Sequence, residues 1–393
     1  MPRRIVIIGG GAIGSATALF LRLADSASEV VVVERDPTYA KASSALSASS
    51  IRQQFSSSLN IRLSQFGIEF LRRAPRALSV GDDYPALGLV EGGYLYLATP
   101  RSLAALAANH RVQQEAAADV VWLSPAELRA RLPWIATADL GGAVLGISGE
   151  GWFDGYALMR GMRRKAQALG ATTLHAEVAS LTLQGGRVVA AVTRSGTRLA
   201  GDVFVNAAGP WARAVAAMAG IDLPVHARRR TVFVLSCPVA IPRCPLVIDP
   251  SGVWFRPDGE TGKRFLCGAS PAPGEADPDD LPLEPDLAQF EERLWPALAQ
   301  RVPAFAALKL ESAWAGYYEM NTFDQNGIVG AHPDLPNLLF ANGFSGHGIQ
   351  HSPAIGRALA ELITAGAYRS IDVSALGFER VLSNTPFVER NVI

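Results

Sequence analysis

Two unbroken apolar runs near the start of the chain set the first expectation about its fold. Residues 4–9 read RIVIIG and residues 29–35 read EVVVVER. Strands that are buried on both faces have continuous apolar runs, whereas strands that face water on one side alternate. Residues 13–24, between the two runs, have the apolar spacing of a helix. The pattern therefore predicts a strand–helix–strand unit that opens a parallel sheet.

Further along the chain, helical spacing and strand-rich stretches follow one another. Helices are predicted at 66–78, 101–118, 155–170 and 287–303, and Asp154 and Gly170 are suited to cap the third. Strand signals are found from about Leu87, in hairpins with the turns QGG and RSGT, at 202–209, over 224–270 and in PNLLFANG near the end. Residues 271–287, rich in Pro, Asp and Glu, read as a surface loop.

This order of elements predicts an α/β fold in which two domains are interleaved. A Rossmann-like nucleotide-binding domain would comprise residues 1–82, 146–220 and 320–393. A mixed-sheet substrate domain of α+β type would comprise residues 83–145 and 221–319. The chain has 393 residues, 49% of them hydrophobic, so two cores can be formed.

The glycines after the first strand indicate the ligand of the first domain. Gly9, Gly11 and Gly14 form GxGxxG directly between a strand and a helix that contains Ile13. The first glycine permits a tight turn, the second lets a pyrophosphate approach the backbone, and the third lets the helix pack on the strand. The positive end of the helix then faces the phosphates. The motif predicts a dinucleotide site.

Glu34 ends the second strand about 20 residues later, where a carboxylate accepts hydrogen bonds from ribose hydroxyls. This carboxylate would repel a 2′-phosphate and argues against NADP. Arg35 beside it is better explained as a solvated strand end than as a phosphate ligand.

At two further places, small residues would let the backbone come close to the cofactor, and these places favour FAD over NAD. The strand ending in Ala207, Ala208 and Gly209 delivers small residues to the site, and a glycine-rich turn lies at 343–348. A flavin extends away from the first turn, and amides at a helix N-terminus stabilise the negative charge of its reduced form. No second GxGxxG unit is seen in the sequence, so we expect FAD without a separate NAD(P)H site.

His347 and His351 are four residues apart, which is the spacing of a helical zinc pair. A zincin needs Glu directly after the first His, and Gly348 stands there instead. The glycines around His347 disfavour a helix, so we expect a loop here and a helix that begins near Ser352 and Pro353. We predict a cofactor turn and no metal site.

The balance of charges and the cysteines indicate which binding partners and which cellular compartment to expect. Lys+Arg and Asp+Glu both number 36, so net charge gives no reason to expect nucleic acid or an anionic membrane surface. Three cysteines without a CxxC pair favour a reduced, cytoplasmic compartment. The basic and apolar N-terminus could be taken for a signal peptide, but the buried strand explains it better. No stretch has the roughly 18 unbroken apolar residues of a membrane helix.

These residues together resemble the D-amino-acid oxidase superfamily of FAD enzymes, in particular its glycine/sarcosine oxidase and dehydrogenase branch. The likeness covers nearly the whole chain. It rests on GGGAIG with Glu34-Arg35, SSALSASSIRQQF, NAAGPWA, WAGYYEMNTFDQNGIVG and GFSGHG. The resemblance implies an FAD-binding Rossmann-like domain with a mixed-sheet substrate domain. It also implies further cofactor contacts at Arg35, Ser43, Ser44, Val178, Trp211, Gly343, Gly346, His347, Gly348, Ile349 and Gln350.

Departures from the family pattern are informative. Covalent flavin enzymes of this family have a His in the segment matching Ser44–Ala48 or a Cys near Gly316. This chain has neither, so the resemblance implies non-covalent FAD. The carboxylate-binding Arg of glycine oxidases is replaced by Tyr317-Tyr318. A Lys of monomeric sarcosine oxidases falls on Gln350, and their oxygen-activating Lys corresponds to Leu266 or Arg264, which argues against fast oxidase activity.

Arg52 matches an arginine of monomeric sarcosine oxidases and lies in an otherwise uncharged stretch. A planar guanidinium can clamp a carboxylate with two parallel bonds. We therefore predict catalytic roles for Arg52, Tyr318 and His347, with Arg256 as an alternative carboxylate ligand. We expect HARRR at 226–230 to be a solvated strand end.

The predicted reaction is oxidation of the C–N bond of an amino acid or N-substituted glycine, with hydride transfer to flavin N5 and hydrolysis of the imine. Either O2 or an electron-transfer acceptor would reoxidise the flavin. Two alternatives remain open: a 2-hydroxy-acid dehydrogenase, and a flavin-bound assembly or electron-transfer protein with little turnover.

Overall fold

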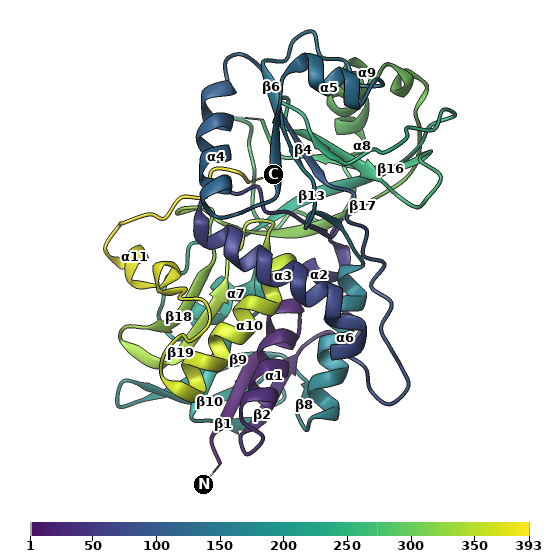
Figure 1. The fold of residues 1–393 in the computed structure, drawn as a ribbon. Helices are drawn as coiled ribbons and strands as arrows, with labels where there is room; N and C mark the ends of the chain where they lie inside the picture. Colours follow the sequence, from purple (N-terminus) through teal and green to yellow (C-terminus); the bar gives the residue numbers. More distant parts are fainter. Residues whose placement is uncertain (1, 273, 393) are drawn as a thin grey trace.

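The computed structural model describes residues 2–272 and 274–392. Its lower body in Figure 1 is built on a six-stranded sheet with the order β18-β19-β12-β1-β2-β8. The strands from β19 to β8 are parallel, and β18 is antiparallel to β19. They are β1 (Arg4–Ile8), β2 (Glu29–Glu34), β8 (Thr172–His175), β12 (Val203–Asn206), β18 (Ile328–His332) and β19 (Leu335–Asn342).

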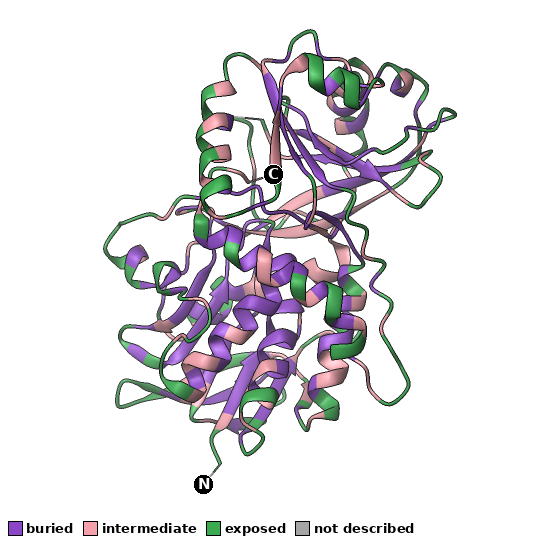
Figure 2. Cartoon of the chain, in the orientation of Figure 1, coloured by how far each residue is buried: buried purple, intermediate pink, exposed green. Residues whose placement is uncertain are grey.

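Both faces of this sheet are covered, which explains its unbroken apolar runs. Ile5 and Ile7 pack against the helices of one face, and Val6 and Ile8 pack against a small antiparallel sheet and α7 on the other. The helices are α1 (Ala12–Ala24), α3 (Ser58–Ala77), α6 (Gly155–Ala168) and α10 (Gly348–Ala365). The small sheet consists of β9 (Val178–Gln184), β10 (Arg187–Thr193) and β11 (Arg198–Ala200), and α7 spans Ala212–Ala217. Figure 2 shows the inner sides of these layers as buried.

The upper body is an eight-stranded mixed sheet with the order β17-β13-β16-β15-β14-β4-β6-β5. Its core contains a cluster of buried phenylalanines, among them Phe233, Phe255 and Phe305. The strands are β4 (Tyr94–Ala98), β5 (Val120–Leu123), β6 (Gly142–Gly146), β13 (Val225–Ser236), β14 (Leu246–Ile248), β15 (Val253–Pro257), β16 (Arg264–Ala269) and β17 (Lys309–Asn321). The predicted α/β class is confirmed, and the predicted division into an FAD-binding and a substrate-binding domain stays a prediction.

Shorter elements connect the two bodies, cover the upper sheet or, like η4 (Ser374–Leu376) and α11 (Glu379–Leu382), pack beside the lower sheet. The others are α2 (Ser43–Leu46), β3 (Ser50–Ile51), α4 (Leu103–Glu115), α5 (Pro125–Arg131), β7 (Gly151–Trp152), η1 (Gly209–Trp211) and η3 (Pro303–Ala307). The helix expected at 287–303 is divided into α8 (Leu287–Gln289), a π-helical turn (Phe290–Leu294) and α9 (Trp295–Arg301).

The predicted start of the last long helix near Ser352 and Pro353 is wrong. Helix α10 begins at Gly348, with His347 as its N-cap residue, and Pro353 lies inside it. Proline has no N–H to donate to the carbonyl four residues earlier. The hydroxyl of Ser352 donates to that carbonyl, Ile349 O, at 2.9 Å. This substitute hydrogen bond lets the helix start one turn earlier than the sequence pattern indicates.

Among the described residues, no helix combines the length and the apolar character that a membrane crossing requires. The three cysteines, Cys237, Cys244 and Cys267, are buried and free.

Candidate active site

The first cavity lies where β1, β2 and β12 end beside the N-terminus of α1, and we call it the nucleotide-side cavity. At two positions of the turn beside this cavity, the backbone packs too closely against its neighbours for any residue except glycine. Gly9 has φ +103°, and a Cβ there would be 2.4 Å from Ala207 O. A Cβ on Gly14 would be 1.9 Å from Gly9 O. The turn thus holds the first N–H groups of α1, which have no intrahelical partner, toward the cavity.

Glu34 lies at the wall of this cavity and also holds the turn in place. Its Oε2 accepts from Gly10 N at 2.7 Å, and its Oε1 accepts from Asp36 N at 2.8 Å. The guanidinium of Arg35 is 3.8 Å from the ring centroid of Trp211. The other predicted cofactor residues that line this cavity are Gly9, Gly11, Ile13, Ser43, Ser44, Val178, Ala207 and Gly209.

Two serines connect α2 to the neighbouring elements. Ala12 N donates to Ser44 Oγ at 3.0 Å, and Ser43 Oγ donates to Tyr317 O at 2.6 Å. Gly209 has a positive φ, in the second close approach. These contacts place α1, α2, η1 and β17 around one continuous depression.

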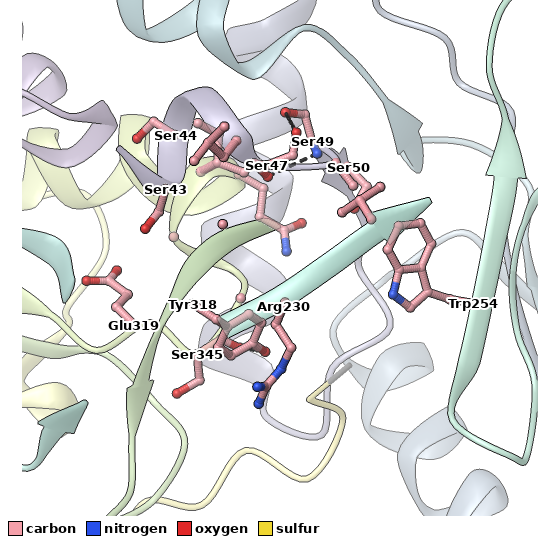
Figure 3. A pocket seen from close by; sticks show the side chains of 18 of the residues that line it. Ser43, Ser44, Ser47, Ser49, Ser50, Arg230, Trp254, Tyr318, Glu319 and Ser345 are labelled. Carbon is pink, nitrogen blue, oxygen red and sulfur yellow. Dashed lines mark hydrogen bonds between the residues drawn. The ribbon is translucent and has the colours of Figure 1, made fainter. Parts of the chain in front are cut away.

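The second cavity, which we call the ring-side cavity, opens between the two bodies (Figure 3). It shares Ala12, Ile13, Ser43, Ser44 and Glu319 with the nucleotide-side cavity. One wall is apolar and consists of Val232, Leu246, Ile248 and Trp254. Of the predicted cofactor residues, Gly346, Gly348, Ile349 and Gln350 line this cavity, and Gly343 is not part of its lining.

Gly343 supports the turn from behind. It has φ +74°, and a Cβ there would be 2.8 Å from Val225 Cγ2. The next close approach is at Gly346, where φ is +90° and a Cβ would be 2.3 Å from the Tyr318 hydroxyl.

Arg52 lines the ring-side cavity and is 5% exposed. Its guanidinium carbon is 4.4 Å from the ring centroid of Phe55, and one terminal nitrogen donates to the carbonyl of Asn391. Its Nε has no hydrogen-bond partner among the described residues. Within the described residues no carboxylate forms an ion pair with this buried guanidinium, although the charges of Glu389 and Glu150 act on it from further away.

The backbone around Arg52 is fixed by two buried polar side chains. Arg52 N donates to Gln350 Oε1 at 2.8 Å. The next two backbone N–H groups, of Gln53 and Gln54, donate to Glu150 Oε1 at 2.6 and 3.0 Å. Burial raises the pKa of Glu150 to about 7, although these hydrogen bonds act in the opposite direction.

The C-terminal segment also reaches this loop. Glu389 accepts hydrogen bonds from Ser56 N at 2.8 Å and from Asn60 Nδ2 at 2.8 Å, and Asn391 Nδ2 donates to Gln54 O at 3.2 Å. In Figure 1 the C-terminus lies beside the upper body, far from the N-terminus.

Tyr318 lines the ring-side cavity on β17, and its hydroxyl donates to Ser345 O. Burial raises the pKa of this hydroxyl above its usual value. Tyr318 is therefore a neutral hydrogen-bonding group at the cavity wall.

His347 does not belong to the residues that line either cavity. Its ring packs 5.4 Å from Phe55 and 5.0 Å from His351, measured between centroids. Neither ring nitrogen has a hydrogen-bond partner among the described residues. Burial, together with the charge of Arg52, lowers the pKa of His347 to about 3, so the ring is neutral at neutral pH. His347 is thus placed behind the wall that carries Arg52.

Arg230 was not among the residues singled out from the sequence, and the expectation that HARRR is only a solvated strand end is wrong for it. Arg230 lines the ring-side cavity, 5.1 Å from the Tyr318 ring centroid. Both terminal nitrogens donate to Asp277, each at 2.8 Å. Alternation along β13 places Arg228 and Arg230 on one face, but the sequence does not show that the face turns toward the cavity.

The other arginine candidates lie elsewhere. Arg256 donates to Pro257 O at 2.8 Å and to Ala48 O at 2.7 Å, and it does not line the cavity. Arg264 is half exposed and pairs with Asp258 and Glu311. Leu266 is buried against Val232 and Val234.

The residues present fit an FAD. The glycine turns bring the backbone to the cavity walls at positions where a Cβ would collide with neighbouring protein atoms, the N-terminus of α1 lies at the nucleotide-side cavity, and the two cavities share five lining residues. Within residues 2–272 and 274–392, no group of three or more His, Cys, Asp or Glu side chains is arranged to hold a metal ion.

The family model described as FAD dependent oxidoreductase (DAO) matches residues 4–362. The chain belongs to this family. It is an FAD-dependent oxidoreductase, as the glycine turns and the resemblance predicted, and FAD is its cofactor.

Relatives of this oxidoreductase span nearly its whole length. FAD-dependent oxidoreductase domain-containing protein 1 of Xenopus laevis is 41% identical over 423 residues, covering 99% of this chain and 84% of the relative. Glycine oxidase of Bacillus licheniformis is 27% identical over 386 residues, covering 95% of this chain and 96% of the relative. The solved structure of glycine oxidase from Geobacillus kaustophilus has a TM-score of 0.80 and 25% identity, covering 95% and 98%. L-proline dehydrogenase from P. horikoshii shares the fold, with a TM-score of 0.83 and 24% identity, covering 98% and 100%.

Proposed function

We propose that this oxidoreductase oxidises the C–N bond of an amino acid or an N-substituted glycine to an imine, which water hydrolyses to a 2-oxo acid. The observation that carries the proposal is Arg52, a buried guanidinium without a carboxylate partner at the wall of the ring-side cavity. A substrate carboxylate would neutralise this charge and form charge-assisted hydrogen bonds. FAD, when bound, supplies the acceptor for two electrons.

The remaining residues position the substrate. Arg52 would hold the carboxylate, because Arg230 is already neutralised by Asp277. The apolar wall of Val232, Leu246, Ile248 and Trp254 would receive the substrate's carbon atoms and exclude water. Tyr318 contributes a neutral wall beside the reacting carbon. No protein base is required if the amine binds in its neutral form, so catalysis rests on positioning and electrostatics.

We infer that the FAD is held without a covalent bond. No His occurs in the segment Ser44–Ala48. At Gly316, the other position used for attachment, an added Cβ would be 2.9 Å from Leu46 Cβ. Acid precipitation should release all the flavin, and flavin that stays in the washed pellet would contradict this inference.

The names of several relatives support an amine substrate, because glycine oxidases of Bacillus licheniformis and Geobacillus kaustophilus are aligned with this chain over nearly their whole length. Neither position that the resemblance matches to the oxygen-activating lysine is a lysine. Leu266 is buried, and Arg264 pairs with Asp258. We therefore favour an electron-transfer acceptor over fast reaction with O2.

The deciding experiment is anaerobic flavin reduction with a panel of amino acids, N-methylated glycines and 2-hydroxy acids. We expect bleaching of the flavin by one amine class. Reduction by 2-hydroxy acids alone would instead identify a 2-hydroxy-acid dehydrogenase. No reduction by any compound would favour the flavin-bound assembly or electron-transfer protein.

A further inference from the structure

Glu319 occupies the junction of the two cavities. It is one of five residues that line both, and the other four, Ala12, Ile13, Ser43 and Ser44, belong to the N-terminal ends of α1 and α2. In Figure 3 its carboxyl group points away from Tyr318 and Arg230. Successive side chains on a strand point to opposite faces, so Glu319 and Tyr318 serve different parts of the site.

The carboxyl group of Glu319 is only half satisfied. The backbone N–H groups of Gly343 and Phe344 donate to it. Its Oε2 is buried and has no hydrogen-bond partner among the described residues. This oxygen faces Gly209, where an added Cβ would be 3.7 Å away. A buried polar atom without a partner is unfavourable and therefore indicates a ligand group.

The part of FAD that must pass this junction is the chain between its pyrophosphate and its ring. That chain carries hydroxyl groups, which can donate to or accept from a carboxyl oxygen. We propose that Glu319 binds the ribityl chain of FAD through its unpartnered oxygen and takes up a proton when the cofactor binds. This proposal rests on the inference that FAD binds without a covalent bond.

The charges around Glu319 leave the cofactor as the decisive influence on its protonation. On β13, which pairs with β17, Arg228 and Arg230 are already bound to Asp277 and Asp279. The glycines at η1 and at the start of α10 carry no charge, and burial keeps His347 and His351 neutral. The other charged residues that line the two cavities are Arg52, Glu34, Arg35, Asp36, Lys41 and Glu177.

The direction of the pH dependence follows from these surroundings. Burial raises the pKa of Glu319 to about 7, against the effect of the two N–H donors. A pyrophosphate nearby adds negative charge and removes water, and both effects raise the pKa further. Between the two pKa values, FAD binding is coupled to uptake of one proton. The dissociation constant should therefore be flat below about pH 6 and rise up to roughly tenfold per pH unit above pH 7.

The test uses apoprotein and the dissociation constant of FAD, followed by flavin fluorescence at about pH 6 and about pH 8. The variants are Glu319→Gln, which imitates the protonated form, and Glu319→Ala. Glu311→Gln is the matched control, because Glu311 also belongs to β17 but pairs with Arg264 and lines neither cavity. Calorimetry in two buffers with different heats of ionisation gives the number of protons taken up.

We expect wild type and Glu311→Gln to bind FAD roughly tenfold more weakly at the higher pH, and Glu319→Gln to lose this dependence. Glu319→Ala should weaken FAD binding about tenfold at the lower pH, yet leave the binding of ADP, which lacks the ribityl chain, within about twofold. A Glu319→Gln protein that keeps the wild-type pH dependence, or a Glu319→Ala protein that binds FAD normally, would overturn the proposal.

Should the variants fail to fold, the proton count of the wild-type protein decides alone, because zero uptake at about pH 7.5 contradicts the proposal. These readouts need no substrate. A failure here is therefore distinguishable from a failure of the proposed amine oxidation, and acid precipitation separately tests the non-covalent bond.

Discussion

The two cavities differ in how the chain builds them. The glycine turn of the nucleotide-side cavity is held by a short-range contact, since Glu34 accepts from Gly10 N only 24 positions away. The ring-side cavity is organised by long-range contacts: Arg52 is held by Gln350 and by Asn391, 298 and 339 positions away. A glycine turn can thus be specified within one strand–helix–strand unit, whereas the surroundings of Arg52 depend on the whole fold.

The largest effect is expected at Arg52, the buried charged residue that these long-range contacts hold in place. Arg52→Ala should reduce the rate of flavin reduction by substrate by roughly 30-fold to several thousand-fold, because loss of a buried charged partner costs about 2–5 kcal/mol. Arg52→Lys should be impaired less than Arg52→Ala because it keeps the positive charge. It should still be slower than wild type, because lysine cannot form the two parallel bonds. Anaerobic stopped-flow absorbance measures the rate, and FAD content should stay near that of the wild type.

The exposed Arg264, which pairs with Asp258 and Glu311, offers the matched control as Arg264→Ala. Normal binding of a carboxylate inhibitor by Arg52→Ala, or loss of its FAD, would remove Arg52 from the proposed role.

In the glycine turn, the largest effect is expected at the first glycine, Gly9. Gly9→Ala should lose FAD and about 2–5 kcal/mol of stability, because the added Cβ collides with Ala207 O and the backbone has φ +103°. Gly196→Ala is the control, since it also has a positive φ but nothing lies within 4 Å. Flavin content and denaturant unfolding are the measurements. Equal losses in both variants would show that backbone strain alone, without the close approach, governs this turn.

A smaller effect is expected at Glu34, which is predicted to bind the ribose of the cofactor. Glu34→Gln should weaken FAD binding roughly tenfold to a hundredfold, because hydrogen bonds to a charged acceptor are worth about 1.5–3 kcal/mol. Glu311→Gln, which lies outside both cavities, should bind FAD like wild type at neutral pH. Fluorescence titration of apoprotein gives both constants, and an unchanged constant for Glu34→Gln would mean that Glu34 does not contact the cofactor.

The smallest effect concerns His347, behind the Arg52 wall. Its native pKa of about 3 lies below the usual 6.5, so an unfolded chain binds a proton that the native one does not. The resulting stability is fully present above pH 6.5 and is lost as the pH falls toward 3. Between pH 6.5 and 5 this amounts to about 2 kcal/mol.

His347→Phe should remove that part of the pH dependence and keep FAD, since neither ring nitrogen has a partner among the described residues. Urea unfolding at the two pH values checks this. A His347→Phe protein whose rate of flavin reduction collapses would instead restore His347 to a catalytic role.

The contrast between the cavities also explains what the sequence could predict. The βαβ unit, the glycine turn after β1 and the α/β class follow from local patterns of Val, Ile and Gly, and they are confirmed, whereas the contacts of this turn with the cofactor stay a prediction. The start of α10 was missed because Ser352 supplies a hydrogen bond that rescues an internal proline. Arg230 and Glu319 were missed because only the pairing of β13 with β17 shows what their strands face. Arg256 was the alternative candidate for the carboxylate ligand, yet its partners are backbone carbonyls.

One strand, β17, supplies neighbouring residues to both cavities, with Tyr318 facing the ring side and Glu319 the junction. It is aligned with β13 from Val225↔Asn321 onward. A slip of one position would exchange the two side chains between the faces. The protein therefore tolerates substitutions at either position more readily than an insertion or deletion before them. In evolution, the substrate pocket and the cofactor junction can be altered independently by point mutation, while changes in the length of this strand would alter both at once.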